Sequence, residues 1–171
     1  MINSVDTSIL LDILIPNTAQ VQSSLRCLSN IDSNDELIIS EAVFAELGSQ
    51  FLSLNDLKKF LRDTGITLVQ SNENSLYEAS RAWKKYSERQ KNEIVCPSCG
   101  KRQTLSCSAC QKVISFRQHI LGDFLIGAHA KIQADRLITR DRGFYRSYFK
   151  DLKILTPKEE IRPSAKVRSS P

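Results

Sequence analysis

Short apolar runs alternate with longer amphipathic stretches along this chain, and the alternation predicts its secondary structure. Five runs are three or four residues long, mainly apolar and bounded by polar or turn-forming residues, as expected for buried strands. These predicted strands cover residues 2–5, 37–39, 66–69, 136–139 and 152–155.

The stretches between these strands carry apolar residues at helical spacing. In the last long stretch Ile120, Phe124, Ala128 and Ile132 fall along one helical stripe, which we expect to face the core. The predicted helices cover residues 9–14, 18–28, 41–51, 54–62, 74–93, 116–134 and 144–149. Short apolar strands that alternate with helices predict an α/β fold with a mainly parallel, centrally buried sheet.

The composition fits one ordinary domain, or one domain with a small insertion. Of the 171 residues 41% are hydrophobic, which is enough for a sizeable core. The first residues lack the basic and apolar regions of a signal sequence, and no apolar stretch approaches the roughly 20 residues of a membrane helix. We therefore expect a soluble, cytoplasmic protein without membrane contact, with a flexible basic tail over residues 157–171.

Four of the five cysteines form two Cys-x-x-Cys pairs, Cys96 with Cys99 and Cys107 with Cys110. Two such pairs supply four thiolates, which form the closed tetrahedral shell of a structural Zn²⁺. In a reducing compartment this metal site is favoured over disulfides. We predict an inserted zinc knuckle over residues 94–112, with a structural rather than a catalytic role.

Positive charge gathers around the cysteine segment. Residues 1–80 carry 4 basic and 11 acidic side chains, whereas residues 81–117 carry 9 basic and 2 acidic ones. A concentrated positive field suits a polyanionic partner such as nucleic acid, although a solvated basic helix over residues 81–91 would explain it equally well. The zinc segment could bind RNA, or serve only as a passive staple or a protein-binding knob. The candidate RNA contacts are Lys101, Arg102, Lys112 and Arg117.

Four acidic residues occupy positions where an α/β fold builds active sites. Asp6 follows the first predicted strand and Asp141 follows the fourth, at the carboxyl ends where such folds bind ligands. Glu46 lies in the helix after the second strand. Asp123 lies within an otherwise apolar helix, where an unpaired carboxylate is costly to bury.

Carboxylates that converge repel one another, and a bound Mg²⁺ or Mn²⁺ would relieve that repulsion. Such a cation could activate water for phosphodiester cleavage. Three of the four residues also have simpler interpretations: Asp6 as a helix cap, Glu46 as a solvated side chain and Asp141 as a turn residue. Asp123 is the hardest to explain in this way. Spacing along the sequence leaves both interpretations open.

The segments around these acidic residues resemble the four motifs of PIN-domain ribonucleases, particularly VapC-type toxins. They are residues 5–12, 39–47, 122–130 and 137–144, in the order found in that family. The similarity extends over about residues 2–156. It implies a PIN-like three-layer α/β/α domain over residues 1–156, with a central, mainly parallel sheet of about five strands.

The resemblance also assigns roles by motif position. The implied catalytic residues and ligands of Mg²⁺ or Mn²⁺ are Asp6, Glu46, Asp123 and Asp141. The implied hydroxyl partners for water or phosphate are Thr7, Ser8 and Thr139. Glu41 is a rival to Glu46, but as the first residue after Ser40 it could simply stabilise the helix N-terminus, so Glu46 is preferred.

The resemblance further implies an endoribonuclease that cleaves RNA, restrained by a cognate antitoxin and assembled as a homodimer. The cysteine segment departs from most small PIN toxins, whereas some PIN nucleases of ribosome biogenesis carry a zinc ribbon. Three functions remain open: the toxin of a type II toxin–antitoxin pair, a nuclease that processes ribosomal RNA, and a catalytically silent RNA- or protein-binding module. The presence of all four acidic residues argues against the third.

Overall fold

A five-stranded sheet forms the centre of the protein. The computed structural model describes residues 1–15, 20–89, 94–95, 101–114 and 120–158. Every strand pairing in the central sheet is parallel, in the order β3-β2-β1-β6-β7. The strands are β1 (Ile2–Val5), β2 (Glu36–Ile39), β3 (Ile66–Leu68), β6 (Arg136–Ile138) and β7 (Ile154–Leu155). All five predicted strands are confirmed.

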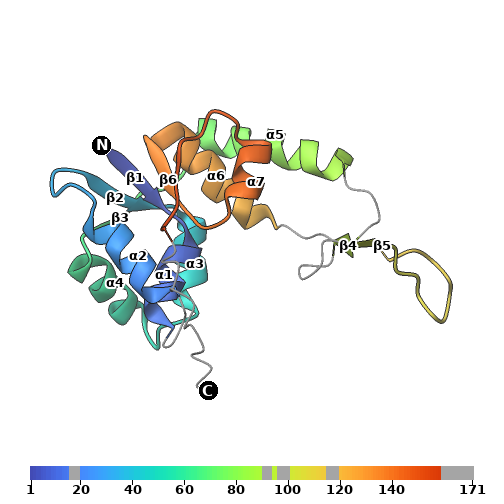
Figure 1. Ribbon diagram of the computed structural model, residues 1–171, viewed down its shortest axis with the longest axis horizontal. Helices are drawn as coiled ribbons and strands as arrows, with labels where there is room; N and C mark the ends of the chain where they lie inside the picture. The colour runs from blue at the N-terminus through green and yellow to red at the C-terminus, as the bar shows by residue number, and fades with distance from the viewer. Residues whose placement is uncertain (16–19, 90–93, 96–100, 115–119, 159–171) are drawn as a thin grey trace, which may run out of the picture.

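Helices cover both faces of this sheet, which confirms the α/β class and the three-layer arrangement (Figure 1). The chain runs outward from β1 to β3, then crosses back to β6 and β7. Because parallel crossovers are right-handed, the helices of these two halves lie on opposite faces. The first half contains α1 (Thr7–Leu14), α2 (Val21–Ser29), α3 (Glu41–Gly48) and α4 (Leu54–Asp63), and the second contains α5 (Glu73–Arg89), α6 (Leu121–Gln133) and α7 (Arg142–Tyr148).

An aromatic cluster holds α5, α6 and α7 together. The ring of Phe124, on α6, lies 5.3 Å from Trp83 and 5.4 Å from Tyr86, both on α5. It also lies 4.9 Å from Phe144 and 5.4 Å from Tyr148, both on α7, and several of these contacts are edge-to-face. Such pairs stabilise by about 0.5–1.5 kcal/mol each beyond their buried area. The cluster therefore fixes α7 against α6, which positions two elements of the site described below.

Some predicted boundaries and one predicted buried face were wrong. The expected stripe of α6 holds at Phe124 and Ala128, but Ile120 is 61% exposed and Ile132 is 42% exposed. The buried surface of α6 is broader than one stripe because the helix packs against α5 and also against β1 and β6. Helix α3 ends at Gly48, three residues before the predicted end.

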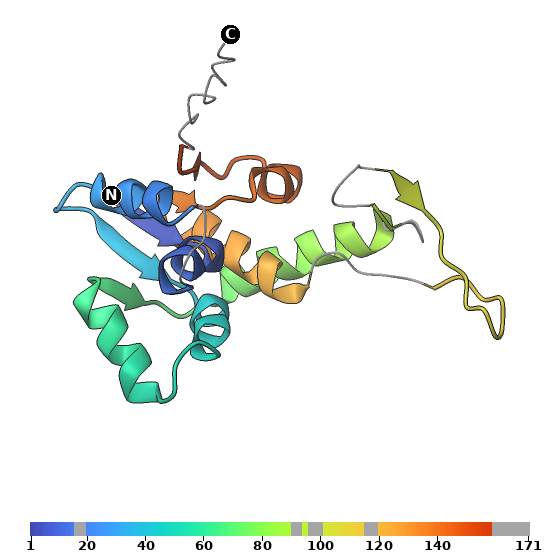
Figure 2. The same ribbon diagram turned by 60° about the horizontal axis from the view of Figure 1, so that its bottom comes forward.

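None of the helices that the structure describes is both long enough and apolar enough to cross a membrane. Strands β4 (Ile94–Val95) and β5 (Arg102–Gln103) form a separate antiparallel pair, drawn well away from the central sheet in both ribbon views (Figures 1 and 2). The described part of the predicted insertion therefore adds no strand to the central sheet.

Half of the predicted zinc knuckle can be described. Around Cys107 the chain makes a tight turn, in which the amide of Gln111 donates to the Cys107 carbonyl over 2.8 Å and Gln111 has a φ of 60°. Hydrogen bonds from the backbone amides of Cys110 and Ala109 lower the pKa of the Cys107 thiol. Cys96 and Cys99 lie outside the described residues, so the zinc site remains a prediction.

Candidate active site

Asp6 is the most buried of the four predicted acidic residues. It directly follows β1, and its amide donates to the carbonyl of Ile138 over 3.0 Å, which ties it to the end of β6. It is only 6% exposed, and its carboxylate accepts hydrogen bonds from Ser8 Oγ at 2.8 Å and Thr139 Oγ1 at 2.5 Å. Although Asp6 holds the N-cap position of α1, its side chain makes no capping bond. The simple helix-cap interpretation is therefore wrong.

Burial and a neighbouring charge both act on the Asp6 carboxyl. Burial raises its pKa, and the negative charge of Glu46 raises it further, while the hydrogen bonds from Thr139 and Ser8 oppose this shift. An ionised Asp6 is thus held in an environment that disfavours its charge. A cation at this position would remove that penalty.

Glu46 extends from α3 toward the same region. Its carboxylate accepts a hydrogen bond from Thr7 Oγ1. Its Oε1 atom lies so close to Gly122 that a Cβ on that residue would be 3.1 Å away. Glu46 is therefore adjacent both to the start of α1 and to the start of α6, where Asp123 lies.

Glu41, the rival to Glu46, is engaged elsewhere. Its carboxylate accepts hydrogen bonds from the amide and the hydroxyl of Ser71, each at 3.0 Å. Burial alone would raise the Glu41 pKa, but these bonds and its own backbone amide lower it overall. The geometry thus favours Glu46 as the member of the acidic cluster.

Asp123 and Asp141 each cap a helix. Asp123 Oδ2 accepts from the amide of Ile120 at 3.0 Å, at the start of α6. Asp141 Oδ1 accepts from the amide of Phe144 at 2.9 Å, at the start of α7. Asp141 therefore has a structural role, as the N-cap of α7 rather than as a turn residue, and Asp123 has one in the first turn of α6.

Tyr145 lies within electrostatic reach of all four acidic residues. Its phenol is almost completely buried and donates to Asp6 Oδ1 over 3.4 Å. Burial raises its pKa well above 10, and the negative charges of the four carboxylates raise it further. Those carboxylates are Asp6, Asp123, Asp141 and Glu46. The sequence analysis did not assign Tyr145 to the site; its position one turn after Asp141 was the available signal.

The three predicted hydroxyl residues all contact this acidic cluster. Thr7 donates to Glu46, and Ser8 and Thr139 donate to Asp6. The Thr139 hydroxyl also accepts from the amide of Asp141 over 3.0 Å. Thr139 therefore bonds to both strand-end acidic residues and sets their relative position.

The cluster fits a hard divalent cation by its donor chemistry. Its side chains offer carboxylate and hydroxyl oxygens, the donors that Mg²⁺ and Mn²⁺ prefer. Within the described ranges, no three His, Cys, Asp or Glu side chains lie close enough to enclose a metal ion. Mg²⁺ typically binds through one or two carboxylates and keeps several waters, so a fully protein-enclosed cage is not required.

A partly buried ion pair adjoins the cluster, and the sequence analysis missed it. Arg140 forms an ion pair with Asp12, with Nε at 2.5 Å, and also donates to Ser24 Oγ at 3.0 Å. Ser24 in turn donates to Asp12 over 2.6 Å. Because Arg140 stands between Thr139 and Asp141, this ion pair anchors the loop that carries both. The available signal was an arginine between two predicted site residues.

The predicted RNA contacts do not join this acidic cluster. Lys101 and Lys112 are exposed and belong to the inserted segment, as does the backbone of Arg102 in β5. Arg117 lies outside the described residues. Any role of this segment in RNA binding remains a prediction.

Comparison with known families supports the pattern of motifs around the cluster. The model of the PIN domain family matches residues 4–150. The chain belongs to the PIN domain family. The matched range includes all four acidic residues and the inserted cysteine segment. No curated protein sequence matches this chain.

Solved structures of low sequence identity share the PIN fold seen here. One is VapBC-1 from nontypeable Haemophilus influenzae, at a TM-score of 0.59 and 16% identity over 91% of this chain and 98% of that chain. VapBC2 from Rickettsia felis, solved with a promoter DNA fragment, has a TM-score of 0.58 and 15% identity over 92% and 100%. VapC20 from Mycobacterium tuberculosis, described as a sarcin-ricin loop cleaving toxin, has a TM-score of 0.51 and 13% identity over 85% and 94%.

Proposed function

We propose that this PIN protein is a metal-dependent endoribonuclease, with Asp6, Glu46, Asp123 and Asp141 as its catalytic residues and ligands of Mg²⁺ or Mn²⁺. The observation that carries this proposal is the buried Tyr145 phenol, which donates to Asp6 and whose pKa is raised by the negative charges of all four carboxylates. Two further observations support it: burial disfavours the ionised form of Asp6, and three hydroxyl groups donate hydrogen bonds to the carboxylates of Asp6 and Glu46.

The protein's own groups would organise the reaction. When bound, the divalent cation would supply an activated water and stabilise the charge that develops on the scissile phosphate. Ser8 and Thr139 keep Asp6 oriented and favour its ionised form, and Thr7 orients the Glu46 carboxylate. Tyr145 stays protonated at neutral pH, so it remains a hydrogen-bond donor to Asp6.

The biological role that we propose is that of a toxin held by an antitoxin, with the toxin as a homodimer. Two of the similar structures are named VapBC-1 and VapBC2, and a third is described as a sarcin-ricin loop cleaving toxin. The second candidate is a nuclease that processes ribosomal RNA, which the cysteine-rich insertion favours. Isolation of the protein with a small DNA-binding partner would support the first role, and isolation with ribosomal precursor particles would support the second.

For the insertion, we propose a structural Zn²⁺ bound by Cys107 and Cys110 together with Cys96 and Cys99. The turn at Cys107 and its amide-to-sulfur hydrogen bonds support this, because such bonds stabilise a thiolate. We expect about one zinc per chain by elemental analysis. Cys107→Ser should lose it, whereas the control Cys27→Ser should keep it. Zinc retained in Cys107→Ser would contradict the site.

The nuclease proposal is tested by incubating the purified protein with total RNA in Mg²⁺, Mn²⁺ or EDTA. We expect discrete fragments with either metal and none in EDTA. Asp6→Asn and Asp123→Asn should lower the cleavage rate by at least about 100-fold. Asp63→Asn, which changes an exposed carboxylate on α4, is the matched control and should cleave normally. Wild-type rates in both site variants would refute the assignment, and no cleavage with any metal would favour a silent binding module.

A further inference from the structure

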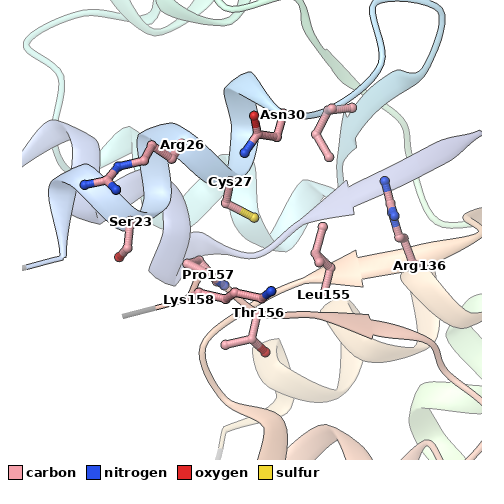
Figure 3. A pocket seen from close by; sticks show the side chains of 10 residues that line it. Ser23, Arg26, Cys27, Asn30, Arg136, Leu155, Thr156, Pro157 and Lys158 are labelled. Carbon is pink, nitrogen blue, oxygen red and sulfur yellow. The ribbon is translucent and has the colours of Figure 1, made fainter. Parts of the chain in front are cut away.

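Two adjoining cavities form a basic groove next to the acidic cluster. The first cavity, of about 490 Å³, is lined by Arg140, Arg142, Thr156, Pro157 and Lys158. The second, of about 450 Å³, shares Thr156, Pro157 and Lys158 with it and continues between α2 and the strands β6 and β7. Figure 3 shows this second cavity, with Cys27 and Asn30 on the α2 side and Arg136 and Leu155 on the strand side.

The parallel sheet places this groove beside the carboxylates. Strands β1, β6 and β7 are neighbours and end at the same edge. Asp6 follows β1, Asp141 follows β6, and the segment 156–158 follows β7. The amide of Thr139 donates to the carbonyl of Leu155 over 3.0 Å, which joins the last two of these ends. The first cavity of the groove is therefore lined by Arg142, the residue that follows Asp141 of the acidic cluster.

The charge of the groove is opposite to that of the cluster. Its lining includes five cationic side chains and no acidic one. These cations are Arg26, Arg136, Arg140, Arg142 and Lys158.

Two of these charges are partly neutralised from outside the lining, since Arg140 pairs with Asp12 and Arg136 with Asp35. Arg142 and Lys158 are exposed, and among the described residues neither forms an ion pair. Among the described residues, the charges of Arg142 and Lys158 are therefore not balanced by an ion pair.

We propose that the basic groove binds the phosphate backbone of the RNA strand next to the scissile phosphate, with Arg142 and Lys158 as the principal contacts. This inference rests on the proposed nuclease function. A strand whose scissile phosphate lies at four carboxylates needs nearby cations for its neighbouring phosphates, because the carboxylates repel them. Arg142 directly follows Asp141, so it is placed to supply the first of these contacts.

The lining of the groove also suits contacts to an RNA strand. Arginine and lysine side chains contact phosphate without reading sequence. In the second cavity Ile31 and Leu155 add apolar surface beside the cations, against which an RNA base could pack. An acidic peptide would also match the charge of the groove. Its binding would not explain why the groove lies beside a proposed catalytic aspartate, whereas the binding of an RNA substrate would.

The test measures the salt dependence of RNA binding. A fluorescein-labelled 12-nucleotide single-stranded RNA is titrated with the protein in EDTA, which prevents cleavage, at several KCl concentrations. Each phosphate contact to a single strand contributes about 0.7 to the slope of log K against log salt. Arg142→Ala/Lys158→Ala should therefore lower the slope by about 1.4 and raise KM for RNA cleavage, with kcat unchanged.

The matched control removes two exposed cations from α4, at the other edge of the sheet. Lys58→Ala/Arg62→Ala makes the same change in net charge and should keep the wild-type slope. Unfolding midpoints within about 2 °C of wild type would show that both double variants are folded.

Three results would overturn the groove assignment. The first is that the groove variant has the same salt-dependence slope and the same KM as the control variant, although the wild type cleaves RNA. That result would leave the nuclease proposal intact. The second is absence of RNA binding by the wild type. The third is loss of binding to a labelled 12-residue polyglutamate in the groove variant while RNA binding is unchanged. Conversely, a reduced slope in a protein that cleaves no RNA would support the groove and refute the nuclease.

Discussion

Gly127, in the middle of α6, tests how tightly the core beneath the acidic cluster is packed. A Cβ added to this residue would lie 2.3, 2.7 and 2.9 Å from three ring carbons of Phe149. Favourable carbon–carbon contacts are about 3.5–4.0 Å, so the ring would have to move by an ångström or more. Phe149 is fully buried and follows α7, so its ring has no open space to enter. Gly127→Ala should therefore destabilise the protein.

The expected magnitude follows from two opposing effects. Overpacking a buried site costs about 1–3 kcal/mol, and the higher helix propensity of alanine returns up to about 1 kcal/mol. Gly48, the last residue of α3, is the control because a Cβ there would meet no atom within 4 Å. Gly48→Ala should be neutral or stabilise by about 0.5 kcal/mol. We expect the two variants to differ by about 2 kcal/mol.

Chemical and thermal unfolding followed by circular dichroism would measure this difference. For a protein of this size, 2 kcal/mol corresponds to about 4–8 °C in unfolding midpoint. The double variant Gly127→Ala/Phe149→Leu should show favourable coupling of at least about 1 kcal/mol, since the smaller side chain makes room. Equal midpoints for Gly127→Ala and Gly48→Ala, or additive effects in the double variant, would refute the packing argument.

Three further predictions concern the site and its support. Gly122→Ala should reduce cleavage more than stability, because the new Cβ would lie 3.1 Å from Glu46 Oε1 and displace that carboxylate; a wild-type cleavage rate would contradict this. The raised pKa of Asp6 means that metal-free folded protein takes up a proton more readily than unfolded protein, so its unfolding free energy should rise, relative to Asp6→Asn, as pH falls toward about 4. A difference between these two proteins that is independent of pH, in urea titrations with EDTA, would exclude the shift. Asp12→Ala should lower the unfolding free energy by about 2–3 kcal/mol, because it leaves the partly buried Arg140 without its ion-pair partner. A double-mutant cycle with Arg140→Met should show a coupling energy above about 1 kcal/mol. Additive effects of the two substitutions would show that the ion pair contributes little to stability.

The strands and the acidic positions could be predicted because their signals are local. A run such as residues 37–39 is apolar on both sides of the backbone, which marks a strand covered on both faces. Asp6 directly follows β1 and Asp141 lies three residues after the end of β6, so a parallel sheet alone brings them to one edge. The start of α6 and the exposure of Ile120 and Ile132 were not predicted. Burial depends on which elements pack against a helix, and the spacing of apolar residues does not contain that information.

The sequence by itself determined the alternation of strands and helices, the acidic residues in family order and the paired cysteines, since each is written in adjacent or regularly spaced residues. Only the tertiary structure decided that Tyr145 lies against Asp6, that Arg140 is held by Asp12, and that the segment after β7 joins Arg142 in a basic groove. These contacts join residues more than 100 positions apart or on separate elements. They arise from the order of strands in the sheet, which is a property of the whole packed chain.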